Sequence, residues 1–335
     1  MKQKAGSIRD IARDTGRSVA TVSRALNGSQ SVTKETRVAI MEAVERLNYI
    51  PNPAARALTT KRSRTIAAVV PTLEHSIFAR FLSSVERTVT RLGYSLVIAV
   101  NNSNLDEELA ATHKLLGMGA EGFIFSGAQH HDELYTLLER RAAPYVFTSC
   151  WDPQANAPTI GYDNHALAHD AVDYLYGLGH RDIGILHGPV AINDRARARL
   201  DGARSFSADD IRLAVCETDL SVTGGLKSVT ELLAGKTNVT ALLCFSDVIA
   251  LGARFALEHA GWKVPQDMSL MGFDNLEWSE NANPPLTTFE LPSRAMGQKA
   301  SEVLIEKLEG GREIEPFELH GRLIVGGSTA RISNG

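Results

Sequence analysis

Apolar residues in the first fifty positions recur three or four residues apart, which is the spacing of one face of an α-helix. They form three sets: Ile8, Ile11 and Ala12; Val22 and Leu26; Ile40, Val44 and Leu47. A residue suited to cap a helix precedes each set, namely Ser7, Ser18 and Thr33, and Asp10 can complete a capping box with Ser7. Gly16 suits the end of the first helix because glycine adopts the left-handed conformation at little cost. The pattern predicts three short helices, the first two joined by a tight turn.

From residue 65 onward, short apolar runs alternate with helical segments. The runs are Thr65–Pro71, Ser95–Ser103, Gly122–Ala128, Tyr145–Cys150, Ile183–Gly188, Leu213–Thr218, Ala241–Asp247 and Met268–Asn275. The helical segments are Phe78–Leu92, Leu105–Met118, His165–Leu178, Gly225–Leu233 and Val248–Ala260. Such alternation predicts parallel sheets flanked by helices. The series breaks near residues 160–164, and a final strand, helix and strand are expected to cross back between two lobes: Leu286–Leu291, Ala295–Leu308 and Leu323–Val325.

The length of 335 residues is too great for one small core and suits a head followed by two domains of roughly 100–150 residues. The predicted fold class is therefore an N-terminal all-α head followed by two α/β lobes, each built on a doubly wound parallel sheet.

Charge is distributed unevenly along the chain. Residues 1–64 hold thirteen lysines and arginines against five acidic residues, whereas residues 65–335 hold 22 against 34. The net charge of −4 therefore hides a basic head on an acidic body. A local positive excess of this kind supplies the phosphate contacts that give proteins non-specific affinity for DNA. Together with the first two helices, it predicts a helix-turn-helix whose second helix lies in a DNA major groove. A three-helix packing module with a solvated charged surface remains an alternative.

Residues 49–61 begin with two prolines and continue as a short alanine-rich run. Asn52 and Pro53 suit the cap and the first turn of a helix, but about eight residues are too few for a stable isolated helix. We expect this helix to form only when DNA or a partner chain supports it. Leu58 would then either insert as a wedge between base steps in the minor groove or rest on the body of the protein.

The head and the segment after it resemble the lactose/purine repressor (LacI/GalR) family of bacterial regulators, and the resemblance extends over essentially the whole chain. The motifs that carry it are Asp10-Ile-Ala12, Gly16, Ser18, Thr21-Val-Ser-Arg24, Leu26-Asn27 and Tyr49 to Leu58. By this resemblance Val19, Ala20 and Arg24 lie where the family reads bases, with Arg24 suited to a bidentate guanine contact. The other implied DNA contacts are Ser7, Ser18, Thr21, Ser23, Asn27, Tyr49, Asn52, Ala55 and Leu58.

The same resemblance implies that the body has the bilobed fold of periplasmic (type I) sugar-binding proteins, with an effector cleft between the lobes. The implied domains are a DNA-binding head over 1–48, a hinge over 49–64, an N-terminal lobe over 65–162 and 290–321, and a C-terminal lobe over 163–289 and 322–335. The effector would change the angle between the lobes and hence the spacing of the two hinges in a homodimer. Such a dimer would read a palindromic operator at a fixed half-site separation.

Three arginines, Arg195, Arg197 and Arg199, fall within five residues after the apolar run that ends at Gly188. Arginines near the carboxyl ends of strands can grip hydroxyls, carboxylates or phosphates. By resemblance Arg199 is the main effector-binding arginine and Asp274 the main hydroxyl-accepting carboxylate. The other implied effector contacts are Phe78, Ser149, Trp151, Asn193, Arg195, Leu220, Ser246 and Asp247. A solvated helix start over 193–199 and a turn-capping role for Asp274 remain open.

Two departures from the family pattern bear on the effector. Ser149 stands where some sugar-binding relatives have an aspartate, and Arg195 and Arg197 are additional cations near the cleft. Fewer carboxylates and more arginines favour an anionic effector, such as a sugar acid or sugar phosphate. The connection over 204–212 is also shorter than the family usually has there.

Other patterns in the chain do not predict chemistry. Gly117-Met-Gly-Ala-Glu-Gly122 satisfies GxGxxG, but it lies between a predicted helix and a following strand, the reverse of the order in a dinucleotide site. His130 and His131 have no ligand at metal spacing and are expected in a surface loop. The three cysteines lie singly in or at the ends of apolar runs, which predicts small buried core residues and argues against a disulfide framework. We therefore expect no cofactor, no metal ion and no enzymatic activity.

The N-terminus lacks the apolar stretch of a signal peptide, and no run of eighteen apolar residues exists, which predicts a cytoplasmic protein without membrane contact. The sequence is that expected of a DNA-binding transcriptional regulator, most simply a repressor. The absence of a heptad extension at the C-terminus favours a dimer over a tetramer. A cytoplasmic solute-binding protein that shares the fold but regulates no gene is the alternative, and the basic head argues against it.

Overall fold

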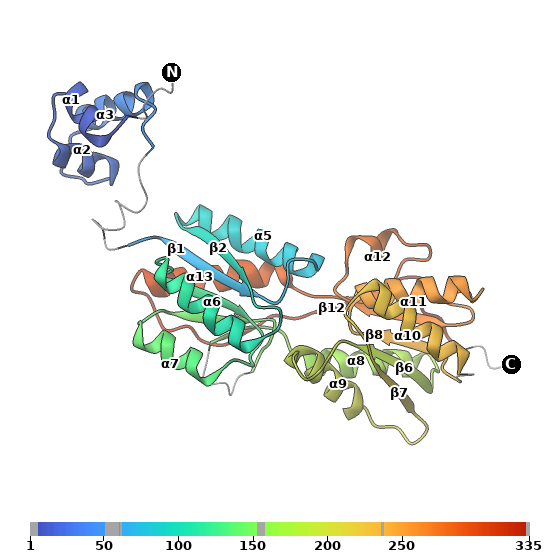
Figure 1. The fold of residues 1–335 in the computed structure, drawn as a ribbon. Helices are drawn as coiled ribbons and strands as arrows, with labels where there is room; N and C mark the ends of the chain where they lie inside the picture. Colours follow the sequence, from blue (N-terminus) through green and yellow to red (C-terminus); the bar gives the residue numbers. More distant parts are fainter. Residues whose placement is uncertain (1–5, 51–59, 61, 153–157, 236–237, 333–335) are drawn as a thin grey trace. The chain divides into compact units, whose positions relative to one another are not determined.

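The computed structural model describes residues 6–50, 60, 62–152, 158–235 and 238–332 (Figure 1). The chain divides into two compact units, Met1–Arg64 and Thr65–Gly335. The described part of the first unit is helical, and the second combines strands and helices.

Helices α1 (Ile8–Asp14), α2 (Val19–Leu26) and α3 (Lys34–Arg46) pack around a small core. This core contains Ile11, Ala12, Val22, Ala25, Val32, Ile40 and Ala43. The three predicted caps are confirmed, because Ser7 forms a capping box with Asp10, while Ser18 and Thr33 each accept a bond from the backbone N–H three residues on. Gly16 has φ +63°, as expected of the left-handed residue that ends α1.

The second unit contains two six-stranded sheets, each between layers of helices. The first sheet has the strand order β11-β5-β4-β3-β1-β2, with every neighbouring pair parallel. Its strands are β1 (Thr65–Val70), β2 (Ser95–Val100), β3 (Gly122–Ser126), β4 (Tyr145–Thr148), β5 (Thr159–Gly161) and β11 (Phe317–Glu318). The helices that pack on it are α5 (Ser76–Arg91), α6 (Leu105–Gly117), α7 (Asp132–Arg140) and α13 (Ser293–Leu308). We call this sheet and its helices the first lobe.

The second sheet has the order β12-β10-β9-β8-β6-β7, in which only β12 runs antiparallel to its neighbour. Its strands are β6 (Asp182–His187), β7 (Arg212–Glu217), β8 (Ala241–Cys244), β9 (Ser269–Phe273), β10 (Thr287–Glu290) and β12 (Arg322–Ile324). Helices α8 (Asn164–Gly177) and α9 (Asp194–Ser205) cover one face, α10 (Val222–Ala234) and α11 (Asp247–His259) the other, and α12 (Glu277–Asn281) follows β9. This is the second lobe.

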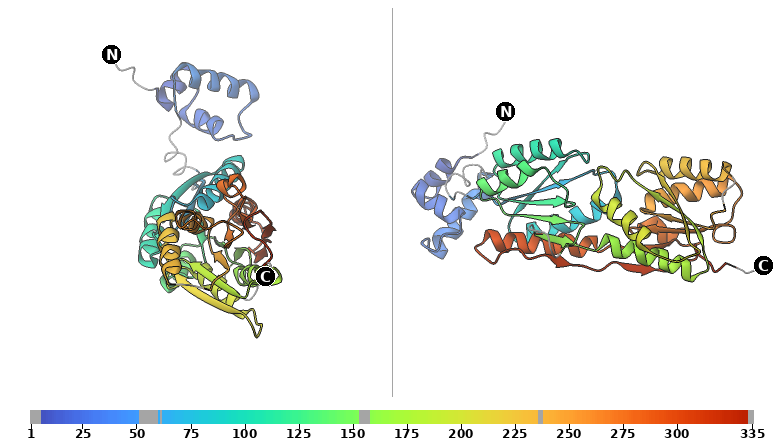
Figure 2. Two further views of the ribbon diagram at one scale, coloured as in Figure 1. Left: turned by 90° about the vertical axis from the view of Figure 1, so that its right-hand side faces the viewer. Right: turned by 90° about the horizontal axis from the view of Figure 1, so that it is seen from below.

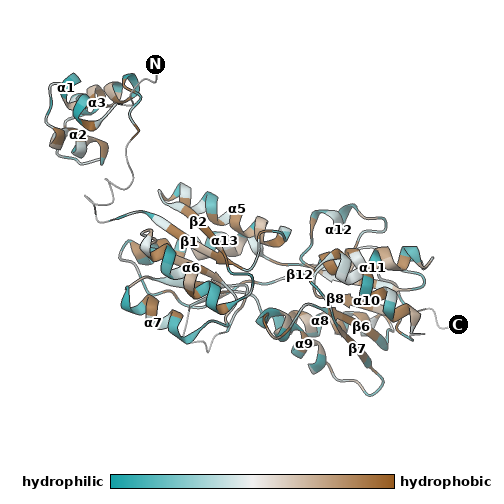
Figure 3. Cartoon of the chain, viewed as in Figure 1, coloured by the Kyte–Doolittle hydropathy of each residue, from teal (hydrophilic) through white to brown (hydrophobic). Residues whose placement is uncertain are grey.

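Side chains that alternate along each strand pack against helices on both faces of the sheet. In β1, Ile66, Ala68 and Val70 belong to the core shared with α5 and α13, while Ala67 and Val69 face the core under α6 and α7. A parallel strand covered on both sides is apolar throughout, and Figure 3 shows the central strands of both sheets as mostly brown.

The chain passes between the two sheets three times: after β5, after β10 and between β11 and β12. As a result α13 packs against α5, β3, β4 and β5 of the first lobe, although it follows nearly all of the second lobe in sequence. Figure 2 shows this helix in red beside the cyan and green elements of the first lobe.

The predicted alternation of strands and helices is confirmed, and the pattern missed only short or polar elements. These are α7, α9, α12, β5 and β11. The predicted helix-to-strand turn at the glycine-rich motif is also confirmed, because Gly117 ends α6, Gly119 has φ +90° and Gly122 begins β3.

The expected surface loop at His130 is wrong. The His130 side chain is fully buried, its Nδ1 lies 2.7 Å from Glu108 Oε1, and its ring stacks on Phe147 with centroids 4.0 Å apart. Its partner lies 22 residues earlier in the chain, a separation that carries no motif. His131, by contrast, is half-buried as the N-cap of α7, where its Nδ1 accepts a bond from the Glu133 N–H.

The cysteines agree only in part with the prediction that they are buried, and the short connection after α9 is closed by two side-chain contacts. Cys244 is fully buried as predicted, whereas Cys150 and Cys216 are only partly buried. The short connection is closed by Phe206, whose ring packs on Tyr176, and by Asp210, which accepts bonds from the Tyr176 hydroxyl and from Arg181.

The described residues show neither a membrane-spanning helix nor a metal-binding cluster. None of the helices there combines the length and the apolar character that a membrane span needs. Within the same ranges, no three His, Cys, Asp or Glu side chains gather as they would around a metal ion.

Candidate functional site

Helix α2 presents one face to the core of the head and another to solvent. Val22 and Ala25 are buried, whereas Val19, Ala20 and Arg24 are exposed. Arg24 has no recorded ion-pair or hydrogen-bond partner among the described residues, so its guanidinium is available for an external contact. An exposed face with one arginine and small apolar residues fits the major groove, where it can reach base edges and thymine methyl groups.

The rest of the head holds α2 in place. Arg37 of α3 donates through Nη1 to the Ala25 carbonyl (2.9 Å) and through Nη2 to the Ser29 carbonyl (2.6 Å). Arg37 thereby ties α3 to the last turn of α2 and to the turn that follows that helix. Arg46 of α3 pairs with Asp14 of α1. The exposed face of α2 is therefore held in place by the rest of the head.

Several of the other predicted DNA contacts lie at the ends of α1 and α2. Ser7, Ser18 and Thr21 lie at the beginnings of α1 and α2, where the Ser18 and Thr21 hydroxyls are 2.9 Å apart. Asn27 is the C-cap of α2 and donates to the Ser23 hydroxyl at 3.4 Å. Tyr49 packs against the core of the head. Asn52, Ala55 and Leu58 lie outside the described residues.

A cavity of about 370 Å³ lies between the two lobes. Of the residues predicted to bind an effector, eight line it: Phe78, Ser149, Asn193, Arg195, Arg199, Leu220, Ser246 and Asp274. Trp151 and Asp247 are not among the lining residues. The volume and the mixture of apolar and polar walls are typical of a small-molecule site.

Arg199 is buried on the wall formed by the second lobe. Its Nε donates to Asn164 Oδ1 at 2.9 Å, and its Nη1 donates to the Phe245 carbonyl at 2.6 Å. Its guanidinium carbon also lies 4.7 Å from the centre of the Phe273 ring. The contacts fix the plane of the guanidinium, and no bond from Nη2 is recorded among the described residues. Arg199 is thus prepared to donate to a ligand in the cavity.

Asp274 follows β9 directly and has the left-handed φ of +112°, which a side chain other than glycine rarely adopts. Its Oδ2 accepts a bond from the Ser246 hydroxyl at 2.9 Å. Burial raises the pKa of Asp274, and the nearby Arg199 opposes that rise. The Asp274 carboxylate can accept a bond from one ligand hydroxyl, while the Arg199 guanidinium donates to a neighbouring oxygen of the ligand.

Asp247 lies behind the cavity wall, where it supports the loop that carries Asp274. Its carboxylate accepts bonds from Leu276 N–H (2.8 Å), the Thr288 hydroxyl (2.7 Å) and the Ser279 hydroxyl (2.5 Å). Burial is the main cause of the raised pKa of Asp247, and repulsion from the Asp274 carboxylate is the second cause. The two carboxyl groups titrate as a pair and hold a proton at a pH where a free aspartate has lost it.

This pair predicts a specific pH dependence of stability. In the range above about pH 4, the unfolded chain has lost protons that the folded pair retains, so the free energy of unfolding falls as pH rises to the raised pKa. Asp247→Asn should flatten this slope by up to about 1.4 kcal/mol per pH unit. Urea denaturation at several pH values between 4 and 8 measures it. The exposed Asp201→Asn should leave the slope unchanged, and an unchanged slope in Asp247→Asn would contradict the assignment.

Arg195 and Arg197, the other two arginines near the start of α9, have different surroundings. Arg195 lines the cavity, and its Nη1 lies 3.0 Å from Asp194 Oδ1. Arg197 donates through Nε and Nη2 to the Val190 carbonyl (3.1 and 2.7 Å) and is not among the lining residues. Each has a partner within the protein, so their number by itself does not favour an anionic effector.

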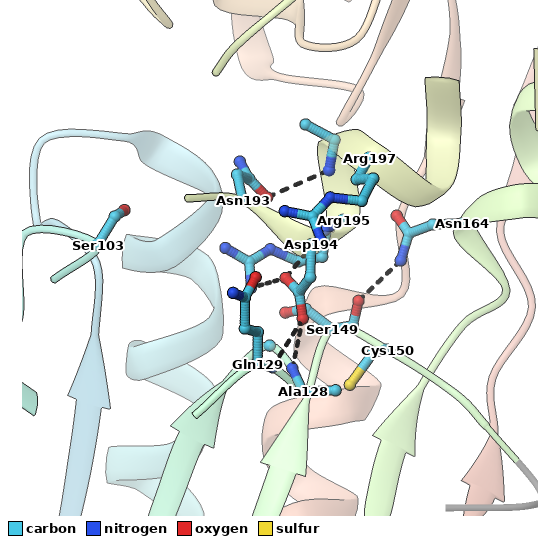
Figure 4. Close-up of polar contacts among 12 residues, drawn as sticks. Ser103, Ala128, Gln129, Ser149, Cys150, Asn164, Asn193, Asp194, Arg195 and Arg197 are labelled. Carbon is cyan, nitrogen blue, oxygen red and sulfur yellow. Dashed lines mark hydrogen bonds and ion pairs between the residues drawn. The ribbon is translucent and has the colours of Figure 1, made fainter. Parts of the chain in front are cut away.

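Ser149 lies at the turn after β4 with φ +67°. Its carbonyl accepts a bond from Asn164 Nδ2 at 2.9 Å, as Figure 4 shows, and its N–H donates to Met296 Sδ at 3.1 Å. Asn164 therefore connects the first lobe with Arg199. The Ser149 backbone is held in place from both lobes.

Several cavity residues were not predicted from the sequence. They are His75, Tyr162, Phe245 and Met296. His75 bonds across the cleft to the Leu220 backbone, and burial lowers its pKa. Tyr162 is buried beside Arg199 and Asp274, and burial raises the pKa of its phenol. These residues have no motif, because only the packing of the two lobes brings them to one cavity.

Comparisons with known proteins agree with both parts of this arrangement. Residues 7–52 match the family model of bacterial regulatory proteins of the lacI family, and residues 172–329 match that of the periplasmic binding protein-like domain. The chain is 32% identical over 327 residues to the HTH-type transcriptional repressor PurR of Proteus mirabilis, covering 95% of each chain. It is 30% identical over 312 residues to the repressor CytR of Escherichia coli (strain K12), covering 92% of each.

A solved structure extends the likeness to three dimensions. The lac repressor dimer bound to operator and the anti-inducer ONPF aligns with a TM-score of 0.89 at 28% identity, covering 98% of this chain and all of that one. Similarity at this level over nearly the full length of both chains includes the head and both lobes. The chain therefore belongs to the LacI family of bacterial DNA-binding transcriptional regulators, and it is a regulator rather than an enzyme.

Proposed function

We propose that this protein is a repressor that binds a palindromic operator as a homodimer and whose affinity for DNA is controlled by a small carbohydrate-type effector between the lobes. The observation that carries the proposal is the presence, in one chain, of a basic head with an exposed α2 and a cavity walled by Arg199 and Asp274. The lac repressor structure, a dimer bound to operator and an anti-inducer, supports this combination of DNA binding and small-molecule binding in one protein.

The proposed DNA contacts lie on the head. Val19, Ala20 and Arg24 contact bases. The other proposed contacts are Ser7, Ser18, Thr21, Ser23, Asn27, Tyr49, Asn52, Ala55 and Leu58. The proposed head covers residues 1–48 and the proposed hinge residues 49–64. The proposed lobes cover 65–162 with 290–321 and 163–289 with 322–335. The membership of the strands in the two sheets supports the lobe limits, apart from Glu290, which ends β10 of the second sheet.

The proposed effector is a polyhydroxylated molecule. Asp274 accepts from its hydroxyls, Arg199 donates to them, and Phe78 and Leu220 pack against its apolar face. Contacts are also proposed for Ser149, Asn193, Arg195 and Ser246, which line the cavity, and an indirect contribution for Asp247, which supports the loop that carries Asp274. A sugar acid or sugar phosphate remains within this class, but the pairing of Arg195 with Asp194 and of Arg197 with Val190 leaves a neutral sugar equally well matched to the walls.

Coupling between the two sites follows from linkage. An effector that changes the affinity for DNA by some factor must have its own affinity changed by DNA by the same factor. The direction of that change decides between an inducer and a co-repressor.

Selection of duplex DNA by the full-length protein tests the proposal. The selection is run without additions and with a panel of neutral sugars, sugar acids and sugar phosphates, followed by a salt titration of the selected site. We expect a palindromic consensus, an affinity that falls steeply with salt, and a shift of that affinity by one class of the panel.

The outcomes separate the parts of the proposal. No preference for any site over random duplex would overturn the regulatory function and favour a solute-binding protein without gene regulation. A selected palindrome with no response to any panel member would retain the DNA-binding function and overturn the effector class.

A further inference from the structure

A carboxylate of the second lobe reaches across the cleft to the backbone of the first. Asp194 is the first residue of α9, and its Oδ2 accepts bonds from the N–H groups of Ala128 (2.5 Å) and Gln129 (3.2 Å) in the loop after β3. Figure 4 shows both bonds converging on this carboxylate. The side chain is 22% exposed, so the bonds are largely shielded from water. Charge-assisted bonds to paired backbone donors are among the stronger hydrogen bonds in proteins.

The second lobe presents this carboxylate in a fixed position. Arg195 Nη1 lies 3.0 Å from Asp194 Oδ1, and Arg195 N–H donates to the same oxygen at 2.8 Å. These contacts occupy Oδ1 and leave Oδ2 for the first lobe. Arg195 and Asp194 also fill the space over Gly127, where an added Cβ would lie 2.3 Å from Arg195 Nη1 and 3.0 Å from both Asp194 oxygens. A larger residue at position 127 would displace these side-chain ends, and its φ of +96° is strained for any residue other than glycine.

The first lobe also holds its half of the contact in place. The Gly127 carbonyl lies 3.1 Å from His130 Nε2, and the opposite ring nitrogen lies 2.7 Å from Glu108 Oε1. Glu108 in turn accepts a bond from Asn101 Nδ2 at 2.8 Å. This buried chain of bonds fixes the loop that offers the two N–H groups. A preorganised loop loses little conformational entropy when the lobes close.

The contact also forms part of the wall of the effector cavity. A second cavity of about 390 Å³ is lined by Asp194 and Gln129. Arg195 and Ile192 line both this cavity and the effector cavity. The pair Asp194–Arg195 thus stands between the two cavities. Opening the contact would separate the lobes at this edge and connect the two spaces.

We propose that Asp194 is an interlobe latch, a positioning residue that holds the two lobes together at this edge of the cleft. It does so by pairing a carboxylate that Arg195 orients with a loop that His130 and Glu108 orient. The closure itself depends only on contacts within the chain. The proposal rests on the proposed function solely where it calls the enclosed space an effector cavity.

Hydrogen exchange of the full-length protein, without DNA or effector, tests the latch. In Asp194→Ala we expect exchange at least about tenfold faster in residues 126–131. We expect faster exchange as well on the far walls of the cleft, in residues 71–78 and 272–276, which make no recorded contact with Asp194. A merely local role would change the first segment and leave the far walls as they are.

Asp201→Ala is the matched control, because Asp201 is an exposed aspartate on the same helix; it should exchange as the wild type does. Strands β6 and β8 report on general unfolding and should be unchanged. If they also lose protection in Asp194→Ala, the comparison moves to Asp194→Asn, which keeps the shape and removes the charge and should give a smaller increase in the same three segments. Far walls that exchange at the wild-type rate in both variants would overturn the latch. Since no ligand enters the measurement, that failure would leave the proposed function standing.

Discussion

Arg199→Ala is expected to lower the free energy of unfolding by about 3–5 kcal/mol, the range for leaving a buried charge without its compensating charge. The substitution removes the cation that most lowers the pKa of the buried Asp274 carboxylate. It also leaves Asn164 Oδ1 and the Phe245 carbonyl without the donor they have in the wild type. Because loss of Arg199 raises the pKa of Asp274 further, the destabilisation should be larger at pH 8 than at pH 5.5, where protonation relieves the unpaired charge. Urea denaturation at the two pH values measures both effects.

Arg197→Ala is the control for this prediction. It removes the same charge two residues away, but Arg197 bonds to exposed backbone carbonyls outside the cavity. Its cost should stay below about 1 kcal/mol. Equal costs for the two substitutions would contradict the buried role of Arg199. Under the proposed function, Arg199→Ala should also retain operator binding and lose the response to the effector that selection identifies, whereas Arg197→Ala should retain both.

Arg24→Ala is expected to reduce binding to the selected operator by about 10- to 100-fold per half-site while changing binding to random duplex far less. One bidentate contact between an arginine and a guanine gives about 1–3 kcal/mol of discrimination, and a dimer would lose two. Arg24 suits this role because it is exposed on α2 and the described residues give it no partner. Fluorescence anisotropy with operator and random duplex at one fixed salt concentration provides the ratio.

Two further variants separate base reading from charge. Arg24→Lys keeps the positive charge and removes the planar fork, so it should lose discrimination while the dependence of affinity on salt stays as in the wild type. Arg140→Ala, on the exposed end of α7, should change neither quantity. An equal loss of affinity for operator and random duplex in Arg24→Ala would mean that Arg24 contacts phosphates instead.

The features of the fold that the sequence predicted are those set by short-range chemistry. The caps at Ser7, Ser18 and Thr33 each act over three residues, and the left-handed Gly16 needs no partner at all. The apolar strands could be predicted equally well, because a strand covered on both faces is mostly apolar. Elements such as α7 and β5 were missed because they are short or carry mixed residues.

The features that the sequence did not predict depend on contacts distant in the chain. His130 is buried because Glu108 lies beneath it, and Asp247 supports a loop through Leu276, Ser279 and Thr288 instead of lining the cavity. Asp194 lies between two predicted site residues but could not be predicted itself, because its partners are backbone N–H groups of the other lobe, which leave no pattern in the sequence.

Helix α13 has a consequence for the order in which the protein can be made. Met296, Ala300, Leu304 and Ile305 belong to the core of the first lobe, yet the ribosome produces them after almost all of the second lobe. Until residue 308 has emerged, the apolar face that this helix covers remains open to water or to chaperones. The first lobe therefore completes its folding late in translation, and a chain that stops before residue 293 lacks one of that lobe's helices.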